Sequence, residues 1–314
     1  MSLAEPSLPA AYRQGAPPAS TVPRVAVIVL NWNGERDTTA CVESFLAQRD
    51  VDVDLLLVDN ASADGSGERL RARFPDVSYL QTGENLGYAG GNNRGIDWAM
   101  TRATEWVLVV NNDTVADPDC VRLLLAAAAS DARLAAAAPL ITRAEEPTRV
   151  WFAGGRFDRL RAVGTHDHEN ALVSAVPVSF EDDPPVLHEC TFLTGCCLLL
   201  RAEALRAVGG FREDFFAYGE DLELAVRLRR NGWRLGWVPA ARLAHRTPPA
   251  QPTPRQILLR DRNRRRLVRA HYGAAWRLAF ALWFWPTRVI HLARYLMRGD
   301  TERAAAIREG MRAR

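Results

Sequence analysis

The sequence predicts an α/β fold in which a mostly parallel sheet has helices on both faces. Two observations support this. From residue 24 onward, short apolar runs alternate with segments of helical spacing, and each apolar run ends in a turn rich in Asn, Asp or Gly. Strands that alternate with helices in this way form βαβ units, which build parallel sheets. The 314 residues are 48% hydrophobic and 25% charged, as in a globular protein with one large core.

The first strand is the β-branched run 25–30, which stops at a turn containing Asn31 and Asn33. Helical spacing follows over residues 38–48, and a second buried strand, 54–58, ends at Asp59. The same patterns predict strands at 77–81, 106–110 and 198–200, and helices at 68–74, 202–208 and 222–230.

Composition divides the chain into three parts. Residues 1–23 are rich in Pro and Ala without periodicity, which predicts a disordered leader. Residues 24–253 carry the alternating pattern and form the main domain, although 143–189 contain many Pro and Gly and read as an irregular or antiparallel insertion. Residues 254–314 predict a basic, aromatic helical extension.

Charge and residue usage exclude several classes of protein. The net charge of +3 gives no indication of a nucleic-acid partner, and the absence of Lys excludes a lysine-based mechanism. The five cysteines are odd in number and lack the spacing of a metal site, which favours buried free thiols in a reducing compartment. Because no basic region precedes an apolar stretch at the N-terminus, we expect a cytoplasmic protein without a secretory signal.

Polar side chains follow three predicted strands, at Asn31, Asp59 and Asn111–Asp113. Parallel sheets bind ligands beyond the carboxyl ends of their strands, so these residues mark a candidate site. A dinucleotide-binding fold would carry G-x-G-x-x-G directly after the first strand. The glycines at 87, 90 and 91 have another spacing and come too late, so that alternative is rejected.

Five segments together resemble glycosyltransferase family 2, in particular its bacterial rhamnosyltransferase-like branch, over residues 24–246. They are Val-Ile-Val-Leu-Asn-Trp-Asn-Gly at 27–34 and the segments 57–66, 85–95, 110–114 and 215–224. The resemblance implies a GT-A catalytic domain over 24–253, with the insertion 143–189 on the acceptor side. It also implies inverting transfer from a UDP- or dTDP-sugar, with dTDP-rhamnose favoured. The acceptor would be a hydroxyl of a glycan, a polyprenyl-linked sugar or a small molecule.

In such enzymes the loops after the first two strands hold the base and ribose. Asp59 would then accept a hydrogen bond from N3–H of uracil or thymine, although Asp-Asn-Ala-Ser is also good turn chemistry. Small residues between 85 and 95 would let the backbone approach a diphosphate. The resemblance implies a nucleotide-sugar-binding set of Asn31, Asn33, Asp59, Asn60, Gly87, Gly91, Asn92, Arg94 and Asn112.

The remaining acidic residues correspond to the family's metal and base positions. Asn111-Asn-Asp113 replaces Asp-x-Asp, which implies Asp113, completed by His245, as ligands of Mg²⁺ or Mn²⁺. Alternatively, Asp113 only forms a turn at the end of its strand, and His245 only makes local hydrogen bonds. Glu220 and Asp221 lie where the family has its catalytic base, and we favour Asp221, although acids in a helix's first turn also suit the macrodipole. His166, His168 and His188 receive no role.

The extension suggests contact with a membrane surface. An arginine cluster at 260–266 precedes a run of only ten uncharged residues, 278–287, which is too short to span a bilayer. Arginines beside Trp276, Trp283 and Trp285 favour helices lying on the inner face of the cell membrane, with Pro286 breaking the apolar stretch. A hairpin packed on the catalytic domain, or on a second subunit of a homo-oligomer, is the alternative.

A non-catalytic nucleotide-sugar-binding or scaffold protein is the rival function for the chain as a whole.

Overall fold

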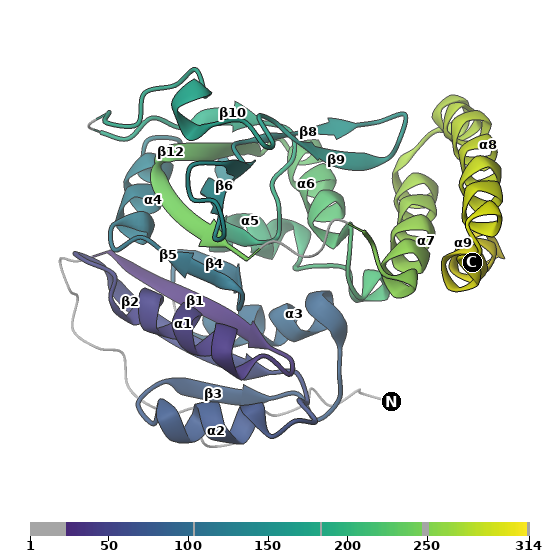
Figure 1. Cartoon of the computed structure of the whole chain (residues 1–314). Helices are drawn as coiled ribbons and strands as arrows, with labels where there is room; N and C mark the ends of the chain where they lie inside the picture. Colours follow the sequence, from purple (N-terminus) through teal and green to yellow (C-terminus); the bar gives the residue numbers. More distant parts are fainter. Residues whose placement is uncertain (1–22, 103, 183, 247–250, 313–314) are drawn as a thin grey trace, which may run out of the picture.

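The computed structural model describes residues 23–102, 104–182, 184–246 and 251–312 (Figure 1). The predicted leader, except for its last residue, lies outside these ranges. The first half comprises β1 (Arg24–Asn31), α1 (Glu35–Leu46), β2 (Asp52–Asp59), α2 (Ser66–Arg73), β3 (Ser78–Gln81), α3 (Gly87–Met100), β4 (Trp106–Asn111), β5 (Thr114–Ala116), α4 (Cys120–Ala129) and β6 (Leu134–Arg143). The second half comprises β7 (Val150–Phe152), β8 (Gly155–Asp158), β9 (Val163–His166), η2 (Val173–Ala175), β10 (His188–Cys190), β11 (Cys197–Arg201), α5 (Ala202–Val208), η3 (Glu213–Phe215), α6 (Glu220–Arg230), β12 (Arg234–His245), α7 (Pro254–His271), α8 (Ala274–Met297) and α9 (Thr301–Arg312).

The main sheet has the strand order β10-β12-β6-β11-β4-β1-β2-β3. Strands β3, β2, β1 and β4 pair in parallel, and β12 pairs in parallel with β6. Because β11 is antiparallel to both β4 and β6, these two strands point the same way. Six of the ten strands therefore share one direction, as the sequence predicts, whereas β5, β7, β10 and β11 run the opposite way and make the sheet mixed.

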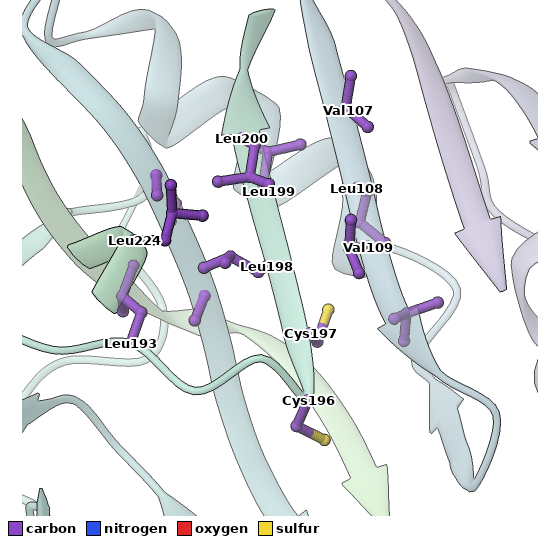
Figure 2. Close-up of a cluster of buried hydrophobic side chains, with 14 of the residues drawn as sticks. Val107, Leu108, Val109, Leu193, Cys196, Cys197, Leu198, Leu199, Leu200 and Leu224 are labelled. Atoms are coloured by element: carbon purple, nitrogen blue, oxygen red, sulfur yellow. The ribbon is translucent and has the colours of Figure 1, made fainter. Parts of the chain in front are cut away.

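Helices cover both faces of this sheet (Figure 1). Helices α1 and α4 lie on one face, where the Val121 N–H donates to Gln48 Oε1 (2.9 Å), and α3, α5 and α6 lie on the other. Strands β4 and β11 are buried on both faces, so their side chains form a continuous apolar core. Figure 2 shows this core, with Cys196 and Cys197 at the start of β11. All five cysteines are buried and unpaired.

The insertion contains antiparallel structure. Strand β7 pairs with β6, and β8 and β9 form a separate two-stranded sheet. The turn between β8 and β9 rests on the C-terminal helices, because the Tyr272 hydroxyl donates to Arg159 O (2.5 Å) and Arg264 Nε donates to Arg161 O (2.9 Å).

The three C-terminal helices pack on the rest of the protein as well as on each other (Figure 1). His271 Nε2 in α7 lies 2.9 Å from Glu223 Oε1 in α6. Buried Arg288 in α8 donates to Asp261 in α7 (2.7 Å), and buried Arg265 donates to the last carbonyls of α9. The extension is therefore packed on the catalytic domain, as the alternative interpretation of the tail proposed.

Two predictions about the tail are wrong. The arginine cluster 260–266 does not form a free basic surface, because Arg264 and Arg265 are largely buried and bind protein carbonyls. Pro286 does not end a helix, since α8 continues through it. Because Pro286 has no N–H, the carbonyl of Leu282, four residues earlier, loses its helical hydrogen bond. Both residues lie on the exposed side of α8, where water can bind that carbonyl. Among the described residues, no helix is both long and apolar enough to cross a membrane.

Candidate active site

The predicted polar residues do meet at the carboxyl edge of the sheet. Strands β1, β2, β4 and β12 end there at Asn31, Asp59, Asn111 and His245, because these strands share one direction. Reversed strand β11 begins at the same edge, directly after Cys196. The edge thus gathers side chains from segments up to two hundred residues apart in the chain.

Asn31 and Asp59 are buried beneath the loops that follow β1 and β2. Asp59 Oδ1 accepts hydrogen bonds from Asn31 Nδ2 (2.9 Å) and Ser62 Oγ (2.6 Å). Asn31 Oδ1 accepts from Thr38 Oγ1 (2.8 Å), and neither Asn31 nor Asp59 is more than 1% exposed. These hydrogen bonds order the two loops, and a direct contact of Asn31 and Asp59 with the donor stays a prediction.

The residues around the start of α3 are also structural. Asn60 Nδ2 donates to Gly87 O (3.1 Å), and its Oδ1 accepts from Leu86 N (3.0 Å). Asn92 is fully buried and donates to Tyr88 O (2.9 Å). Both side chains are enclosed and order the start of α3, and a contact of Asn60 or Asn92 with the donor stays a prediction.

The two glycines and the arginine of α3 also make contacts within the protein, and their predicted place beside a diphosphate stays a prediction. A Cβ at Gly91 would meet Leu30 Cδ1 at 2.6 Å, and one at Gly87 would lie 2.4 Å from Phe216 O. These glycines thus permit close packing between protein elements, which is a different reason from the predicted approach to a diphosphate. Arg94 lies on the surface of α3, with Nη1 3.7 Å from Glu213 Oε1.

Three residues of the edge stay accessible on the nucleotide side. Asn33 has φ of 53° and its Oδ1 accepts from the Ala63 N–H (2.8 Å), which joins the loops after β1 and β2. Asn112 Nδ2 donates to Thr38 Oγ1 (2.8 Å). Trp32, between the two asparagines of the first loop, is 49% exposed, and an exposed indole offers a face on which a base can stack. Trp32 received no role from sequence reasoning.

Asp113 and His245 come together as predicted, from the β4–β5 turn and the end of β12. His245 Nε2 lies 3.3 Å from Asp113 Oδ1, and Asp113 Oδ1 is a buried atom without a hydrogen-bond partner. A carboxylate oxygen and an imidazole nitrogen that converge without a hydrogen bond fit a shared divalent ion, which would take its other ligands from phosphate and water. Asp113 and His245 are only a pair, and nowhere among the described residues do three or more His, Cys, Asp or Glu side chains form a group that could hold a metal ion.

The charge of Asp113 controls His245 when no ion is bound. Burial alone would lower the pKa of His245, but the Cys196 sulfur and the Asp113 carboxylate beside it outweigh burial and raise the pKa to about 10. Burial also raises the pKa of Cys196, so that thiol is uncharged at neutral pH and Asp113 supplies the negative charge. A divalent ion would reverse this balance and hold the imidazole neutral.

Glu220 and Asp221 begin α6 and differ in their surroundings. Glu220 is 5% exposed and its Oε2 is buried without a partner. Burial, and then the charge of Asp221, raise the pKa of Glu220 well above its usual range. Burial also raises the pKa of Asp221, but the N–H groups of Gly195 (3.0 Å) and Leu222 (2.7 Å) stabilise its ionised form. The pair therefore favours a protonated Glu220 and an ionised Asp221.

Gly195 joins the acidic pair to the His245 pair. Its N–H donates to Asp221 Oδ2, its carbonyl accepts from the Tyr88 hydroxyl (2.6 Å), and the next residue is Cys196 beside His245. A Cβ at Gly195 would lie only 2.8 Å from Tyr88 Oη. Sequence reasoning missed both Gly195 and Tyr88, although Gly195 directly precedes the apolar run of β11.

The insertion closes the other side of the site. Trp151 from β7 packs at a tilt of 58° against His245, with ring centroids 4.4 Å apart, and the centroid of the His166 ring from β9 lies 4.7 Å from that of Trp151. His166 Nδ1 lies 3.0 Å from Trp151 O, which assigns the proton to Nδ1 and leaves Nε2 able to accept a hydrogen bond. Burial lowers the pKa of His166, so this ring is neutral. Sequence reasoning gave His166 no role because the insertion has no recognisable motif.

The comparisons with known proteins agree with this geometry. The model of the family described as "Glycosyl transferase family 2" matches residues 26–209, more than half of the chain. The chain belongs to glycosyltransferase family 2. It is 33% identical to the N-acetylglucosaminyl-diphospho-decaprenol L-rhamnosyltransferase of Mycobacterium tuberculosis over 205 residues, which are 62% of this chain and 66% of the relative. It is 25% identical to the low-salt glycan biosynthesis hexosyltransferase Agl10 of Haloferax volcanii, over 76% of this chain and 74% of the relative.

The solved structures show the fold of this glycosyltransferase. The structure of GalNAc-T7 with UDP, GalNAc and Mn²⁺ matches 82% of the chain and 49% of that protein, with a TM-score of 0.63 at 14% identity. The GT-A fold predicted from the sequence is thus confirmed. The alignment with the mycobacterial rhamnosyltransferase spans just under two thirds of that relative's length.

Proposed function

We propose that the protein is an inverting, metal-dependent glycosyltransferase in which Asp221 is the catalytic base. The observation that carries the proposal is the placement of Asp221, which accepts hydrogen bonds from the Gly195 and Leu222 N–H groups next to the convergent Asp113 and His245, whereas burial raises the pKa of Glu220 well above its usual range. Asp221 is also the more accessible of the two acids, since Glu220 is buried. The structure therefore favours Asp221 over Glu220 as the group that meets an acceptor hydroxyl.

The reaction requires one proton acceptor and one leaving group. The acceptor oxygen attacks the anomeric carbon from the side opposite the diphosphate, and its proton passes to a carboxylate oxygen of Asp221. The bond from the anomeric carbon to the phosphate oxygen breaks as the new glycosidic bond forms, so the configuration inverts. Gly195 N–H and Leu222 N–H hold Asp221 in place for this step. His166 Nε2 and the Trp151 ring provide a polar and an apolar surface for the acceptor sugar.

Asp113 and His245 would hold a Mg²⁺ or Mn²⁺ ion, which would neutralise charge on the departing diphosphate.

For the donor, we favour dTDP-rhamnose, with a UDP-sugar as the alternative. The mycobacterial relative's name, a rhamnosyltransferase acting on an N-acetylglucosaminyl-diphospho-decaprenol, supports both this donor and a polyprenyl-linked acceptor. Glycans and small molecules with free hydroxyls are the other acceptor classes.

A donor screen tests the proposed activity. Purified protein with Mn²⁺ and an N-acetylglucosaminyl-diphospho-prenyl acceptor should release dTDP from dTDP-rhamnose, or UDP from one UDP-sugar, and the product should have the anomeric configuration opposite to the donor's. A product that retains the donor's configuration would contradict the inverting mechanism. Nucleotide-sugar binding without release from any donor would instead favour the non-catalytic binding protein.

The membrane contact rests on α8, whose outer face is apolar. Ala274, Ala275, Leu278, Leu282, Trp285, Pro286, Val289, Ile290, Ala293, Leu296 and Met297 are exposed and follow helical spacing along one side. Leu278 is 62% exposed and Leu282 is 69% exposed, although such side chains are normally buried. Exposed arginines flank this face and α8 contains no acidic residue, so the face complements an anionic bilayer surface.

Trp276 and Trp283 contribute less than predicted, because Arg159 stacks over Trp276 (4.2 Å) and Arg161 lies over Trp283 (5.9 Å). Sedimentation with vesicles that contain anionic lipid tests the apolar face. The full chain should bind, Leu282→Glu with Val289→Glu should abolish binding, and Ala305→Glu, on the exposed side of α9, should not. If the wild type stays in solution and the double variant converts a dimer to a monomer, the face is a contact between subunits and the membrane proposal is wrong.

A further inference from the structure

The chain immediately before Glu220 and Asp221 has an unusual backbone. Phe216 has φ of 63° and ψ of −63°, which is the rarer and more strained form of γ-turn, closed by the Ala217 N–H on Phe215 O (2.8 Å). Tyr218 and Gly219 follow with φ of 71° and 94°. Non-glycine residues in such conformations are strained and persist only where their surroundings hold them.

Asn263 of α7 binds this segment at three points. Its Nδ2 atom lies 2.8 Å from each of the carbonyl oxygens of Phe215, Ala217 and Tyr218, and the side chain is 1% exposed. Its two N–H groups thus serve three carbonyls, with one N–H shared between two of them. Two of these carbonyls, of Phe215 and Ala217, belong to the γ-turn, and the third belongs to Tyr218, which follows it.

Neighbouring groups fix the orientation of the Asn263 amide. Arg262 Nε donates to Asn263 Oδ1 (3.0 Å), and a guanidinium can only donate, so the oxygen must face Arg262 and the NH₂ group must face the carbonyls. Arg262 Nη2 donates to Phe215 O as well (2.8 Å). On the opposite side, the Ala89 N–H of α3 donates to Phe216 O (3.1 Å). The segment 215–219 is therefore held between α3 and α7.

We infer that Asn263 is a positioning residue for catalysis: from the C-terminal extension, it holds segment 215–219 in the backbone conformation that places Asp221 at the active site. The inference rests on the proposed role of Asp221. It assigns a second function to α7, which completes the catalytic unit in addition to carrying α8. Within the cluster 260–266, Arg262 reinforces the bond to Phe215 O, and it is Asn263 that binds Ala217 O and Tyr218 O.

The decisive variant is Asn263→Asp, which keeps the shape of the side chain but replaces the NH₂ donor by a carboxylate oxygen facing three carbonyls. Misplacement of a catalytic group by about 1 Å costs on the order of 100-fold in rate, so we expect kcat to fall by roughly 10–100-fold. Donor KM should change by less than about threefold, because Asn263 does not contact the donor loops. Asn263→Ala, which introduces no charge, provides the same comparison should the aspartate variant fail to fold.

Asp261→Asn is the matched control. It is the reverse exchange on the same helix, at a side chain that is also 1% exposed, but it contacts Arg288 in α8 and not segment 215–219. We expect Asp261→Asn to lower the melting temperature and to leave kcat nearly unchanged. Hydrogen exchange of the amides of residues 215–222, measured without substrate, should become faster in the Asn263 variants and not in Asp261→Asn.

Two results would overturn the inference. One is unchanged exchange in segment 215–222 in both Asn263 variants. The other is a fall in kcat that follows the loss of melting temperature equally in the Asn263 and Asp261 variants, which is the result of general destabilisation. In an Asp221→Asn background, Asn263→Asp should add little further loss. If the wild type transfers no sugar, the proposed function fails, whereas the exchange measurement still decides whether Asn263 holds the segment.

Discussion

Gly195→Ala should damage both the stability and the pH dependence of the enzyme. The added Cβ would lie 2.8 Å from Tyr88 Oη and 3.2 Å from Cζ, so the ring or the loop must move by roughly 0.6 Å to reach ordinary contact. Overpacking of this kind costs about 1–3 kcal/mol. At about 2–4 °C per kcal/mol for chains of somewhat smaller size, the melting temperature should fall by several degrees.

The same displacement weakens the Gly195 N–H bond to Asp221 Oδ2, now 3.0 Å long. A hydrogen bond to a charged group contributes about 1.5–3 kcal/mol. Because this hydrogen bond lowers the pKa of Asp221, its loss should raise that pKa further. The base acts when deprotonated, so the acidic limb of the kcat profile should move to higher pH, with kcat recovering in alkaline buffer. Nucleotide release from pH 5 to 9 measures this shift.

Two companion variants make the reasoning refutable. Gly273→Ala is the control, because Gly273 has φ of −73° and open space around its Cβ position. Tyr88→Phe removes the atom nearest to the added methyl group, so the double variant should lose less stability than the sum of the two single changes. An unshifted pH limb in Gly195→Ala would show that Gly195 does not stabilise the ionised base. Additive losses would show that the contact with Tyr88 is not the cause.

Three further predictions concern the acidic residues. Asp113→Ala should abolish donor turnover, and EDTA should do the same until Mg²⁺ or Mn²⁺ is restored; full activity in EDTA would exclude the metal site. Asp221→Asn should lower kcat by about 10²–10⁴ with nearly unchanged donor binding, and a greater loss in Glu220→Gln would reverse the two roles. Burial raises the pKa of Glu220 in the folded protein above its ordinary value of 4.5. The protonated side chain therefore adds stability that is fully present below pH 4.5 and is lost as the pH rises through the folded-state pKa. Calorimetry should therefore show Glu220→Gln melting progressively higher than wild type as the pH is raised from 5 to 9, and an equal difference at all pH values would contradict this ionisation cost.

Much of the fold could be predicted because its signals are local. The β-branched run 25–30 lies within β1, and the helix predicted at 202–208 has the bounds of α5. The positions of Asn31, Asp59 and Asp113 at one edge also followed from the pattern, since parallel strands bring their carboxyl ends together, whereas His245 was expected there only from the family resemblance. Local spacing did not predict the continuity of α8 through Pro286, because that depends on which side of the helix faces solvent.

The roles of single side chains were less predictable. Asn31 and Asp59 suit a ligand contact and a turn equally well in the sequence, and only the packing of the loops after β1 and β2 shows that their hydrogen bonds are directed inward. Likewise, nothing near His166 in the sequence indicates that it lies beside Trp151 at the site.

The sequence by itself determined the family, the parallel βαβ half of the sheet and the edge at which Asp59 and Asp113 gather, because each of these depends on patterns within short segments. The tertiary structure alone decided which of those residues face inward, which acid is ionised, and how α7 reaches the active site. Asn263 lies 45–48 residues from the carbonyls that it binds, and the protonation of Glu220 depends on burial among distant elements. Such interactions form only when the chain has packed, because contacts between distant segments, and the loss of water around a charge, have no signature in local spacing.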